Sequence, residues 1–337
     1  MTRRLLLSAM APAAASAQRT FNEIARPKEA PRAGIVEVSR IGGKANHNAF
    51  TDLVRFRERW YCVYREASTH VSNDGAIRVL SSPDASSWVT SARLDYPVAD
   101  LRDPKICVTP DNQLLLSAAA AMHPPADYKH KTLVWHSKDG RDWSPAEEIG
   151  EHDFWLWRLH WHRNRAFALG YSTTGERVLR SYVSQDGVHY DVLNPKVLDQ
   201  AYPNETSIVF LPDESALCLL RRDEGAKTAL LGRSRPPYRG WTWQDLGMRI
   251  GGPHMIRLPD GRLVAAVRLY EGAARTSLCW LEPSLPALTE FLVLPSGGDT
   301  SYAGLVFHDG LLYVSYYSSH EEKTAVYLAK VKLPPRA

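Results

Sequence analysis

The stretch Tyr202–Asp223, YPNETSIVFLPDESALCLLRRD, decides the fold. It contains two apolar runs of strand type, Ile208–Leu211 and Ala216–Leu220. The PDES segment between them reverses the chain, because Pro presets φ and Asp supports a turn. The resulting hairpin brings together the polar residues at its two ends, which are Asn204 and Glu205 on one strand and Arg221, Arg222 and Asp223 on the other.

The same strand, turn and strand unit occurs six times along the chain. Its turn positions are spaced 47 to 53 residues apart, at Glu58, Asp111, Asn164, Asp213, Asp260 and Asp309. A third strand-like run follows every hairpin, and a fourth follows five of them. Four antiparallel strands repeated at this spacing are typical of a β-propeller blade. The sequence therefore predicts an all-β fold, a six-bladed β-propeller.

The sixth unit ends after its third strand, Ala325–Lys330. The segment Gly34–Ile41, which precedes the first unit, can supply the missing outer strand and thereby remove an exposed sheet edge. We therefore predict a single propeller domain over residues 34–337, without helices.

The first 17 residues have a different character. Arg3 and Arg4 precede the apolar run Leu5–Ala15, and Ala15-Ser-Ala17 forms an A-x-A cleavage site. We predict a secretory signal peptide over residues 1–17. Its paired arginines are also compatible with export by the twin-arginine route. An N-terminal extension, residues 18–33, follows it. The protein is then expected to be secreted or periplasmic, with no membrane span.

The net charge and the cysteines bear on the possible partners, disulfides and metal sites. Removal of residues 1–17 lowers the formal net charge from +4 to +2, which is too small to indicate a nucleic-acid or membrane-surface partner. The cysteines are expected to be buried small hydrophobes rather than paired, because each lies in an apolar run: Cys62, Cys107, Cys218 and Cys279. No metal-binding spacing occurs, so the sequence predicts no metal and no cofactor. We expect a monomer.

The polar residues of the repeats point to one face. In a propeller, the loops before the first strand and after the second strand of each blade meet around the central channel. Convergent polar groups on such a concave face form the default binding site. Arginines there suit a carboxylate, and aromatic rings suit a sugar. The candidate binding residues are His47, Arg65, Arg102, Asp103, Trp157, Arg158, Asn204, Arg222, His254 and Arg268.

Three units share a further turn between their third and fourth strands. The turns are Ser82–Trp88, Ser137–Trp143 and Ser184–Tyr190, each with the pattern Ser-x-Asp followed by an aromatic residue. Ser and Asp can satisfy the backbone donors of the turn while the aromatic ring packs onto the blade. We interpret these segments as structural turns.

In blade order, these stretches resemble the sialidase family, the six-bladed exo-α-sialidases. The Ser-x-Asp turns resemble sialidase Asp-boxes, one residue shorter than the usual form. Asn204-Glu205 with Arg222 resembles the segment of the catalytic glutamate and second arginine. The remaining similar segments are Arg275–Leu278 for the third arginine, Ser301–Leu305 for the tyrosine nucleophile, and Asp74 for the acid/base.

The resemblance implies a glycoside hydrolase that removes a terminal acidic sugar. Tyr302 would be the nucleophile, Glu205 its base and Asp74 the general acid, with Arg222 and Arg275 binding the sugar carboxylate. A neutral tyrosine avoids repulsion between that carboxylate and an anionic nucleophile. We expect Tyr302 and Glu205 to lie within hydrogen-bond distance, and the two arginines to point into the channel.

One departure from the family pattern leaves the identity of the sugar undecided. The slot of the family's first arginine reads Asn48–Asp52 and contains no arginine, although Arg65 or Arg102 can occupy the same space. The substrate is then sialic acid or another acidic sugar, such as a uronic acid. Two alternatives remain: a propeller polysaccharide lyase acting on a uronate glycan through a Tyr or His base, and a non-catalytic carbohydrate-binding propeller.

Overall fold

The computed structural model describes residues 33–336, and the only regular elements among them are β-strands. The predicted all-β class is confirmed. The predicted signal peptide and nearly all of the N-terminal extension lie outside the described residues. Within residues 33–336 no helix is present that is long and apolar enough to cross a membrane.

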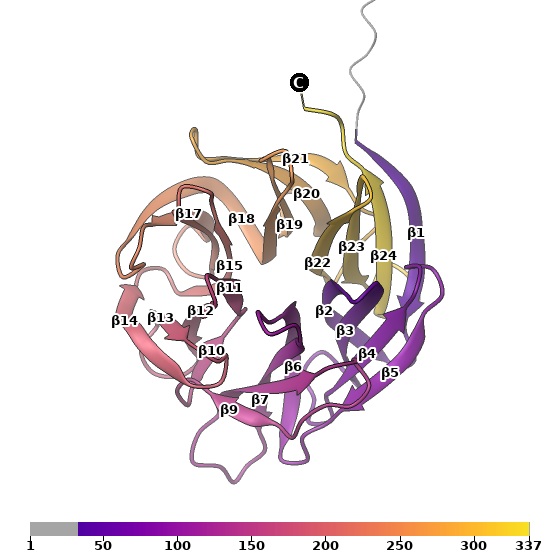
Figure 1. Cartoon of the computed structure of the whole chain (residues 1–337), viewed down its shortest axis with the longest axis horizontal. Helices are drawn as coiled ribbons and strands as arrows, with labels where there is room; N and C mark the ends of the chain where they lie inside the picture. The colour runs from indigo at the N-terminus through magenta and orange to yellow at the C-terminus, as the bar shows by residue number, and fades with distance from the viewer. Residues whose placement is uncertain (1–32, 337) are drawn as a thin grey trace, which may run out of the picture. The chain divides into compact units, whose positions relative to one another are not determined.

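All strand pairings are antiparallel, and the sheets lie side by side around a central opening (Figure 1). The first sheet contains β2 (His47–Phe56), β3 (Arg59–Ala67), β4 (Ala76–Ser82) and β5 (Val89–Leu94). The second contains β6 (Ala99–Val108), β7 (Leu114–Met122), β8 (His130–Ser137) and β9 (Glu147–Ile149). The third contains β10 (Phe154–Leu156), β11 (His160–His162), β12 (Arg165–Ser172), β13 (Leu179–Ser184) and β14 (Tyr190–Leu198).

The hairpin of the stretch Tyr202–Asp223 forms β15 (Pro203–Phe210) and β16 (Ala216–Arg222). Strand β17 (Thr228–Ser234) pairs with β16. The long strand β18 (Trp241–Arg257) pairs with β17 over its first part and with β19 (Leu263–Leu269) from Ile250 onward. It thereby leads directly into the next set of strands, which continues with β20 (Arg275–Glu282) and β21 (Ala287–Val293).

The last sheet joins the two ends of the described chain. It contains β22 (Thr300–His308), β23 (Leu311–Ser318), β24 (Ala325–Lys332) and β1 (Gly34–Gly42). Strand β1 pairs with β24 from Gly34↔Lys332 to Gly42↔Val326, so the predicted pairing of residues 34–41 with the last unit is confirmed.

Hydrogen bonds link neighbouring sheets close to the axis. Each joins a side chain of one sheet to the backbone of the next, and five of the six side chains lie on innermost strands, the exception being Thr132 on β8. In four the backbone N–H donates: Ile106 N to Asp52 (2.9 Å), Leu156 N to Thr132 (3.1 Å), Ile208 N to His160 (3.2 Å) and Met255 N to Ser207 (2.9 Å). In two the side chain donates to a carbonyl: His254 to Ala303 O (3.0 Å) and Thr51 to Tyr302 O (2.9 Å). Taken in order, these bonds pass from every sheet to its neighbour and return to the first.

The Ser-x-Asp turns are structural, as predicted. Asp84 accepts hydrogen bonds from the backbone N–H groups of Ser86 and Ser87, and Asp139 and Asp186 repeat the pattern. The aromatic residue that ends each turn packs against an apolar cluster between sheets. All four cysteines are unpaired.

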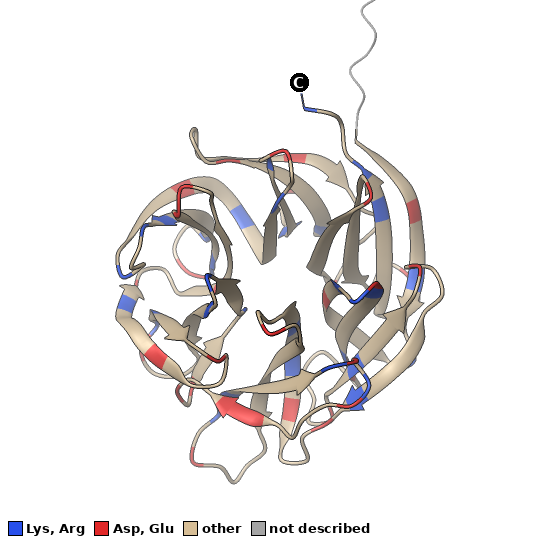
Figure 2. Cartoon of the chain, in the orientation of Figure 1, with Lys and Arg blue, Asp and Glu red and all other residues tan. Residues whose placement is uncertain are grey.

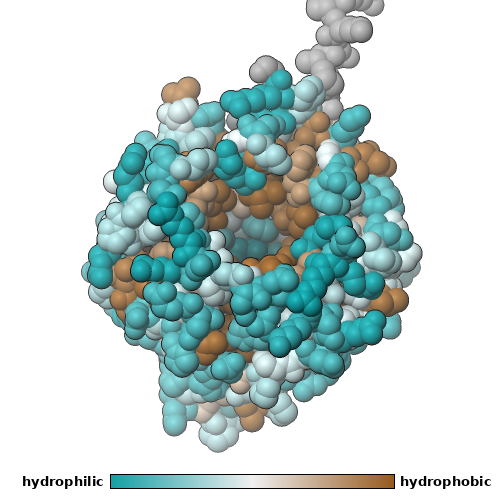
Figure 3. Space-filling view, in the orientation of Figure 1, coloured by the Kyte–Doolittle hydropathy of each residue, from teal (hydrophilic) through white to brown (hydrophobic). Residues whose placement is uncertain are grey.

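Charge is distributed around the ring rather than gathered on one side (Figure 2). The space-filling view shows a hollow at the centre, with hydrophobic and hydrophilic residues both around it (Figure 3).

A β-bulge interrupts the innermost strand in five of the six repeats. The pairing skips two residues in each case: Phe50-Thr51, Asp103-Pro104, Asn204-Glu205, Gly252-Pro253 and Tyr302-Ala303. The first residue of four of these pairs has positive φ, between 47° and 59°. Only one of those four is glycine, so three side chains are held in a conformation that is unusual for them. Bulges of this kind re-aim side chains beside functional sites.

Candidate active site

Residues of these bulges form part of a cavity of about 370 Å³ at one end of the channel. This volume lies at the low end of the range that is usual for small-molecule sites, roughly 300–1,000 Å³. The lining combines carboxylates, one arginine, several aromatic rings and the loop between β3 and β4: Val71, Ser72, Asn73, Asp100, Arg102, Asp103, Ala121, Met122, His130, Trp155, Trp157, Tyr171, Glu205 and Tyr302.

Tyr302 and Glu205 meet in this cavity. The Tyr302 hydroxyl donates to Glu205 Oε1 at 2.6 Å, so the predicted contact between two segments 97 residues apart is confirmed. Glu205 Oε2 accepts a hydrogen bond from Gly252 N at 2.7 Å, which fixes the carboxylate. Both side chains are more than nine-tenths buried.

The electrostatics of the pair follow from burial and from a neighbouring guanidinium. Burial alone would raise the pKa of Glu205, but Arg221 and the hydrogen bonds from Tyr302 and Gly252 outweigh it and hold that pKa below its ordinary value. Burial and the charge of Glu205 raise the pKa of Tyr302 well above its ordinary value. At neutral pH the pair is therefore a neutral phenol bonded to a carboxylate.

Arg221, not Arg222, is the arginine that contacts Glu205 and Tyr302. Arg221 Nη1 donates to Glu205 Oε1 at 2.6 Å and to the Tyr302 hydroxyl at 3.0 Å. Arg222 instead binds Thr228 and Asp245, on the outer side of its own sheet. The prediction for Arg222 was wrong because side chains alternate along a strand, so two consecutive arginines face opposite ways.

The prediction for Arg275 was also wrong. Its guanidinium forms two 2.8 Å bonds with Glu290 on the neighbouring strand β21, away from the cavity. Arg65, expected nearby, is completely buried and binds Asp100, Leu101 O, Thr69 O and Ser72. It holds the β3–β4 loop in place and presents no donor to a ligand.

Asp74, the predicted general acid, lies outside the cavity lining, whereas Asp103, predicted as a binding residue, belongs to it. Asp74 accepts bonds from the backbone and hydroxyl of Ser68, as a turn residue does, and is absent from the cavity lining. Hydrogen bonds from Ser72 and Ser68 hold the pKa of Asp74 below its ordinary value, which is unsuitable for a general acid.

Asp103 lines the cavity beside Tyr302 and Glu205. It is 95% buried, its φ is 47°, and its Oδ1 has no hydrogen-bond partner among the described residues. Burial, reinforced by the charge of Glu205, raises the pKa of Asp103 despite Lys105 and Arg102 nearby. A strained, buried carboxyl with a raised pKa has the properties of a proton donor.

Aromatic rings and Arg102 form the cavity wall. Trp157, a predicted binding residue, packs edge-on against Tyr302, with ring centroids 5.8 Å apart. Arg102 stacks over Phe50 at 5.6 Å and makes a longer contact, 3.5 Å, with Asp100. The lining also contains Trp155, Tyr171 and His130, which the sequence analysis did not assign to the site. The rings of His130 and Tyr171 both stack on the ring of Trp155.

Three further predicted residues lie beside the cavity but are engaged with protein groups. Asn204 binds Asp223 at 2.9 Å and supports the Glu205 backbone. Arg268 lies over the Tyr302 ring at 5.3 Å and bonds Asp299, Tyr317 and the carbonyl of Thr300. His47 bonds Asp299 at 3.1 Å.

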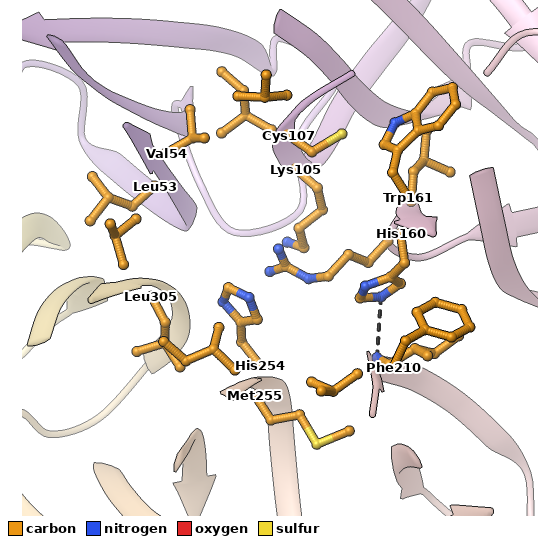
Figure 4. A pocket seen from close by; sticks show the side chains of 18 of the residues that line it. Leu53, Val54, Lys105, Cys107, His160, Trp161, Phe210, His254, Met255 and Leu305 are labelled. Carbon is orange, nitrogen blue, oxygen red and sulfur yellow. Dashed lines mark hydrogen bonds between the residues drawn. The ribbon is translucent and has the colours of Figure 1, made fainter. Parts of the chain in front are cut away.

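His254 and Arg158 lie in a second cavity, about 550 Å³ in volume, at the other end of the channel. Arg158 forms a 2.8 Å ion pair with Asp52, and His254 bonds Ala303 O. Lys105, His160 and His254 point toward one another in this cavity (Figure 4). Burial lowers the pKa of Lys105 to about 8. The structure thus separates these two predicted binding residues from Tyr302 and Glu205.

Comparison of the structure with solved proteins identifies the fold. A Dyadobacter fermentans protein described as of unknown function superposes with a TM-score of 0.80 at 18% identity, over 90% of this chain and 100% of that one. A Penicillium chrysogenum α-L-arabinanase complexed with arabinobiose gives 0.67 at 12% identity, over 88% and 98% of the two chains. Trypanosoma rangeli sialidase gives 0.68 at 10% identity, over 89% and 60%.

The fold is that of the sialidase-like propellers. No family model and no curated protein matches the sequence itself. At these identities the likeness extends to the fold, and the chemistry of this chain must be argued from its own residues.

Proposed function

We propose that this chain is a secreted glycoside hydrolase of the sialidase type, which removes a terminal acidic sugar from a glycan. We infer that its sheets are the six blades of one closed propeller over residues 34–337, preceded by a signal peptide over residues 1–17. The circuit of hydrogen bonds near the axis and the pairing of β1 with β24 support closure.

The observation that carries the proposal is the contact of Tyr302, which lines the cavity, with Glu205 at 2.6 Å and with Arg221 at 3.0 Å. Tyr302 Oη attacks the anomeric carbon while its proton passes to Glu205 Oε1. Arg221 stabilises the charge that develops on the phenol oxygen.

Asp103 is the acid of this proposal. It protonates the leaving glycosidic oxygen as the bond to the anomeric carbon breaks, which leaves a sugar bound to Tyr302 and an Asp103 carboxylate. That carboxylate then takes a proton from water as the water attacks the anomeric carbon. Tyr302 leaves and recovers its proton from Glu205, so that every group returns to its starting state.

An acidic sugar is supported by the neutral tyrosine and by Arg102. A substrate carboxylate beside the reacting carbon would repel an anionic nucleophile but not a phenol. Arg102 faces the cavity, and its one carboxylate contact among the described residues is the long one with Asp100, so a sugar carboxylate can bind it.

A neutral terminal sugar is the second candidate. It is favoured by the pairing of Arg221 with Glu205 and of Arg268 with Asp299, which leaves Arg102 as the single arginine of the lining. Asp100 and Asp103 can then accept hydrogen bonds from sugar hydroxyls, and the tryptophans can stack on the ring.

The test is a panel of aryl glycosides with sialic acid, glucuronic acid and neutral sugars. We expect Tyr302→Phe and Glu205→Gln to reduce turnover by about 10²-fold to 10⁴-fold or more. Thermal stability should be unchanged in Tyr302→Phe, whereas Glu205→Gln removes the charge partner of Arg221 and is compared with the wild type by circular dichroism at a temperature where both are folded. Tyr327→Phe, which changes a tyrosine of β24 in the outer part of its sheet, is the control. Release of an unsaturated uronate would replace the proposal with a lyase, and sugar binding without turnover would replace it with a binding module.

A further inference from the structure

Two histidines and an aspartate converge at the edge of the candidate active site. His47 Nε2 and His70 Nδ1 both contact Asp299 Oδ2, at 3.1 and 2.7 Å, and the three ligand atoms lie within 4.8 Å of one another. The residues come from the start of β2, the β3–β4 loop and the segment before β22. We propose that His47, His70 and Asp299 bind a divalent transition-metal ion, with zinc as the best match to this donor set.

The donor atoms suit such an ion. Imidazole nitrogen and carboxylate oxygen bind zinc at about 2.0–2.2 Å, and two histidines with one carboxylate form a common three-ligand set that leaves a coordination position open. The contacts of 2.7 and 3.1 Å are those of hydrogen bonds, and ligands of a tetrahedral ion stand only a few tenths of an ångström farther apart.

The surroundings of Asp299 provide a second argument. Its other oxygen, Oδ1, accepts hydrogen bonds from Tyr317 at 2.7 Å and Arg268 at 3.1 Å. Such outer contacts orient a ligating carboxylate and leave Oδ2 directed at the two imidazoles. Nδ1 of His47 has no partner among the described residues, so we expect moderate rather than very tight affinity.

Accessibility decides what the ion can reach. The side chain of His47 is 9% exposed, that of Asp299 28% and that of His70 48%, so the cluster is closed on the inside and open to solvent on one side. Water or a substrate oxygen can fill the open position.

The position links the ion to the candidate active site. The ring of Phe50 packs against His70 at 5.2 Å and against Tyr302, also at 5.2 Å. Residues 71–73, which directly follow His70, line the cavity. A bound ion would therefore hold this loop against the segment that leads to Tyr302. It would also partly neutralise the carboxylate of Asp299, which bonds Arg268 through its other oxygen.

The experiment uses the full chain without a polyhistidine tag, dialysed against a chelator and then titrated with Co²⁺. We expect one equivalent of Co²⁺ to produce visible d–d absorption of a four- or five-coordinate site, and Zn²⁺ to displace it. Zn²⁺ should also raise the thermal midpoint, because it binds the folded chain.

His70→Ala, at a half-exposed position, should weaken Co²⁺ binding by about tenfold or more while circular dichroism stays unchanged. Asp299→Asn is the second variant. His189→Ala is the matched control, since His189 contacts Asp186 at 2.7 Å on the surface without a third ligand.

Wild-type protein that shows neither d–d absorption nor a zinc-dependent shift in melting would overturn the proposal, as would His70→Ala protein that binds Co²⁺ as the wild type does. These readouts do not involve sugar cleavage, so the outcome is independent of the proposed hydrolase activity.

Discussion

The two cavities of the channel are built from the same innermost strands and differ in chemistry. The larger, of about 550 Å³, is lined by residues that follow the bulges, such as Leu53, Ile106 and Leu305. The smaller, of about 370 Å³, contains bulge residues themselves, including Asp103, Glu205 and Tyr302. Size therefore does not single out the candidate active site.

The difference lies in the backbone that carries each cavity's polar groups. In the larger cavity Arg158 pairs with Asp52, while His160 and His254 bond the backbone of the next sheet. These groups hold the sheets together, and unpaired atoms occur in both cavities, because Arg158 Nε and Asp103 Oδ1 each have no hydrogen-bond partner among the described residues. In the smaller cavity, Asp103 and Tyr302 are bulge residues with positive φ, 47° and 50°. Backbone strain, which costs stability and is typical of functional sites, therefore distinguishes the smaller cavity.

The largest effect expected from a test of this comparison is on turnover in Asp103→Asn. Loss of the proposed acid should lower kcat/KM by about 10²-fold to 10⁴-fold. In the wild type, activity should fall as pH rises through the raised pKa of Asp103, and the variant should lose this alkaline limb. Glu205, with its lowered pKa, should stay ionised into the acid range.

Asp74→Asn is the control for that prediction. If the pH profile of Asp74→Asn changes and that of Asp103→Asn does not, Asp74 is the acid, and the assignment from the cavity lining is wrong.

A smaller effect on turnover should separate the adjacent arginines. Arg221→Lys keeps the charge but loses the fixed pair of contacts with Glu205 and Tyr302, so we expect kcat to fall by about 10²-fold to 10³-fold. Arg222→Lys, which changes a residue bonded to Thr228 and Asp245, should leave kcat unchanged. Equal losses in the two variants would show that general packing of β16, not the Arg221 contacts, controls activity.

The same two arginines show how far the sequence could lead. The repeat predicted the strands and the pairing of residues 34–41 with the last unit, whereas the resemblance to sialidases predicted the meeting of Glu205 with Tyr302. Strand alternation contained the information to choose Arg221, because it shares a face with Leu217 and Leu219, which pack toward β19. Arg222 shares the opposite face with Cys218 and Leu220.

Other parts of the site had no readable sequence signal. The sequence analysis placed Asp103 among the binding residues, but nothing in the sequence indicated its positive φ, since such a conformation normally favours glycine. Trp155 and its pairing partner Tyr171 lie on β10 and β12, and no turn residues in the sequence indicated that the first strand of the third unit is divided into β10 and β11.

The larger cavity should respond in stability rather than in turnover. Arg158→Met leaves Asp52, only 1% exposed, without its guanidinium partner, and removing one partner of a buried ion pair typically costs about 3–5 kcal/mol of unfolding free energy. Urea unfolding measures this loss, and adding Asp52→Asn to the variant should recover part of it. Arg158→Met protein with normal stability and impaired kcat would instead make this cavity part of the active site.

The smallest expected effect is a gain in stability from Asp103→Asn. A folded-state pKa above the unfolded one means that ionised Asp103 destabilises the fold, so wild-type stability falls as pH rises from the ordinary Asp pKa, about 3.9, through the raised value. At neutral pH the neutral asparagine avoids this penalty, and we expect a small gain in the free energy of unfolding. The gain should vanish below the ordinary pKa, where both side chains are uncharged.

Asp74→Asn should act in the opposite direction, because a lowered pKa means that ionised Asp74 stabilises the fold at neutral pH and ceases to do so as pH falls. Urea midpoints of the two variants across the acid range test these opposite signs, and a loss of stability in Asp103→Asn at neutral pH would mean that its carboxylate is a structural partner rather than a strained catalytic group.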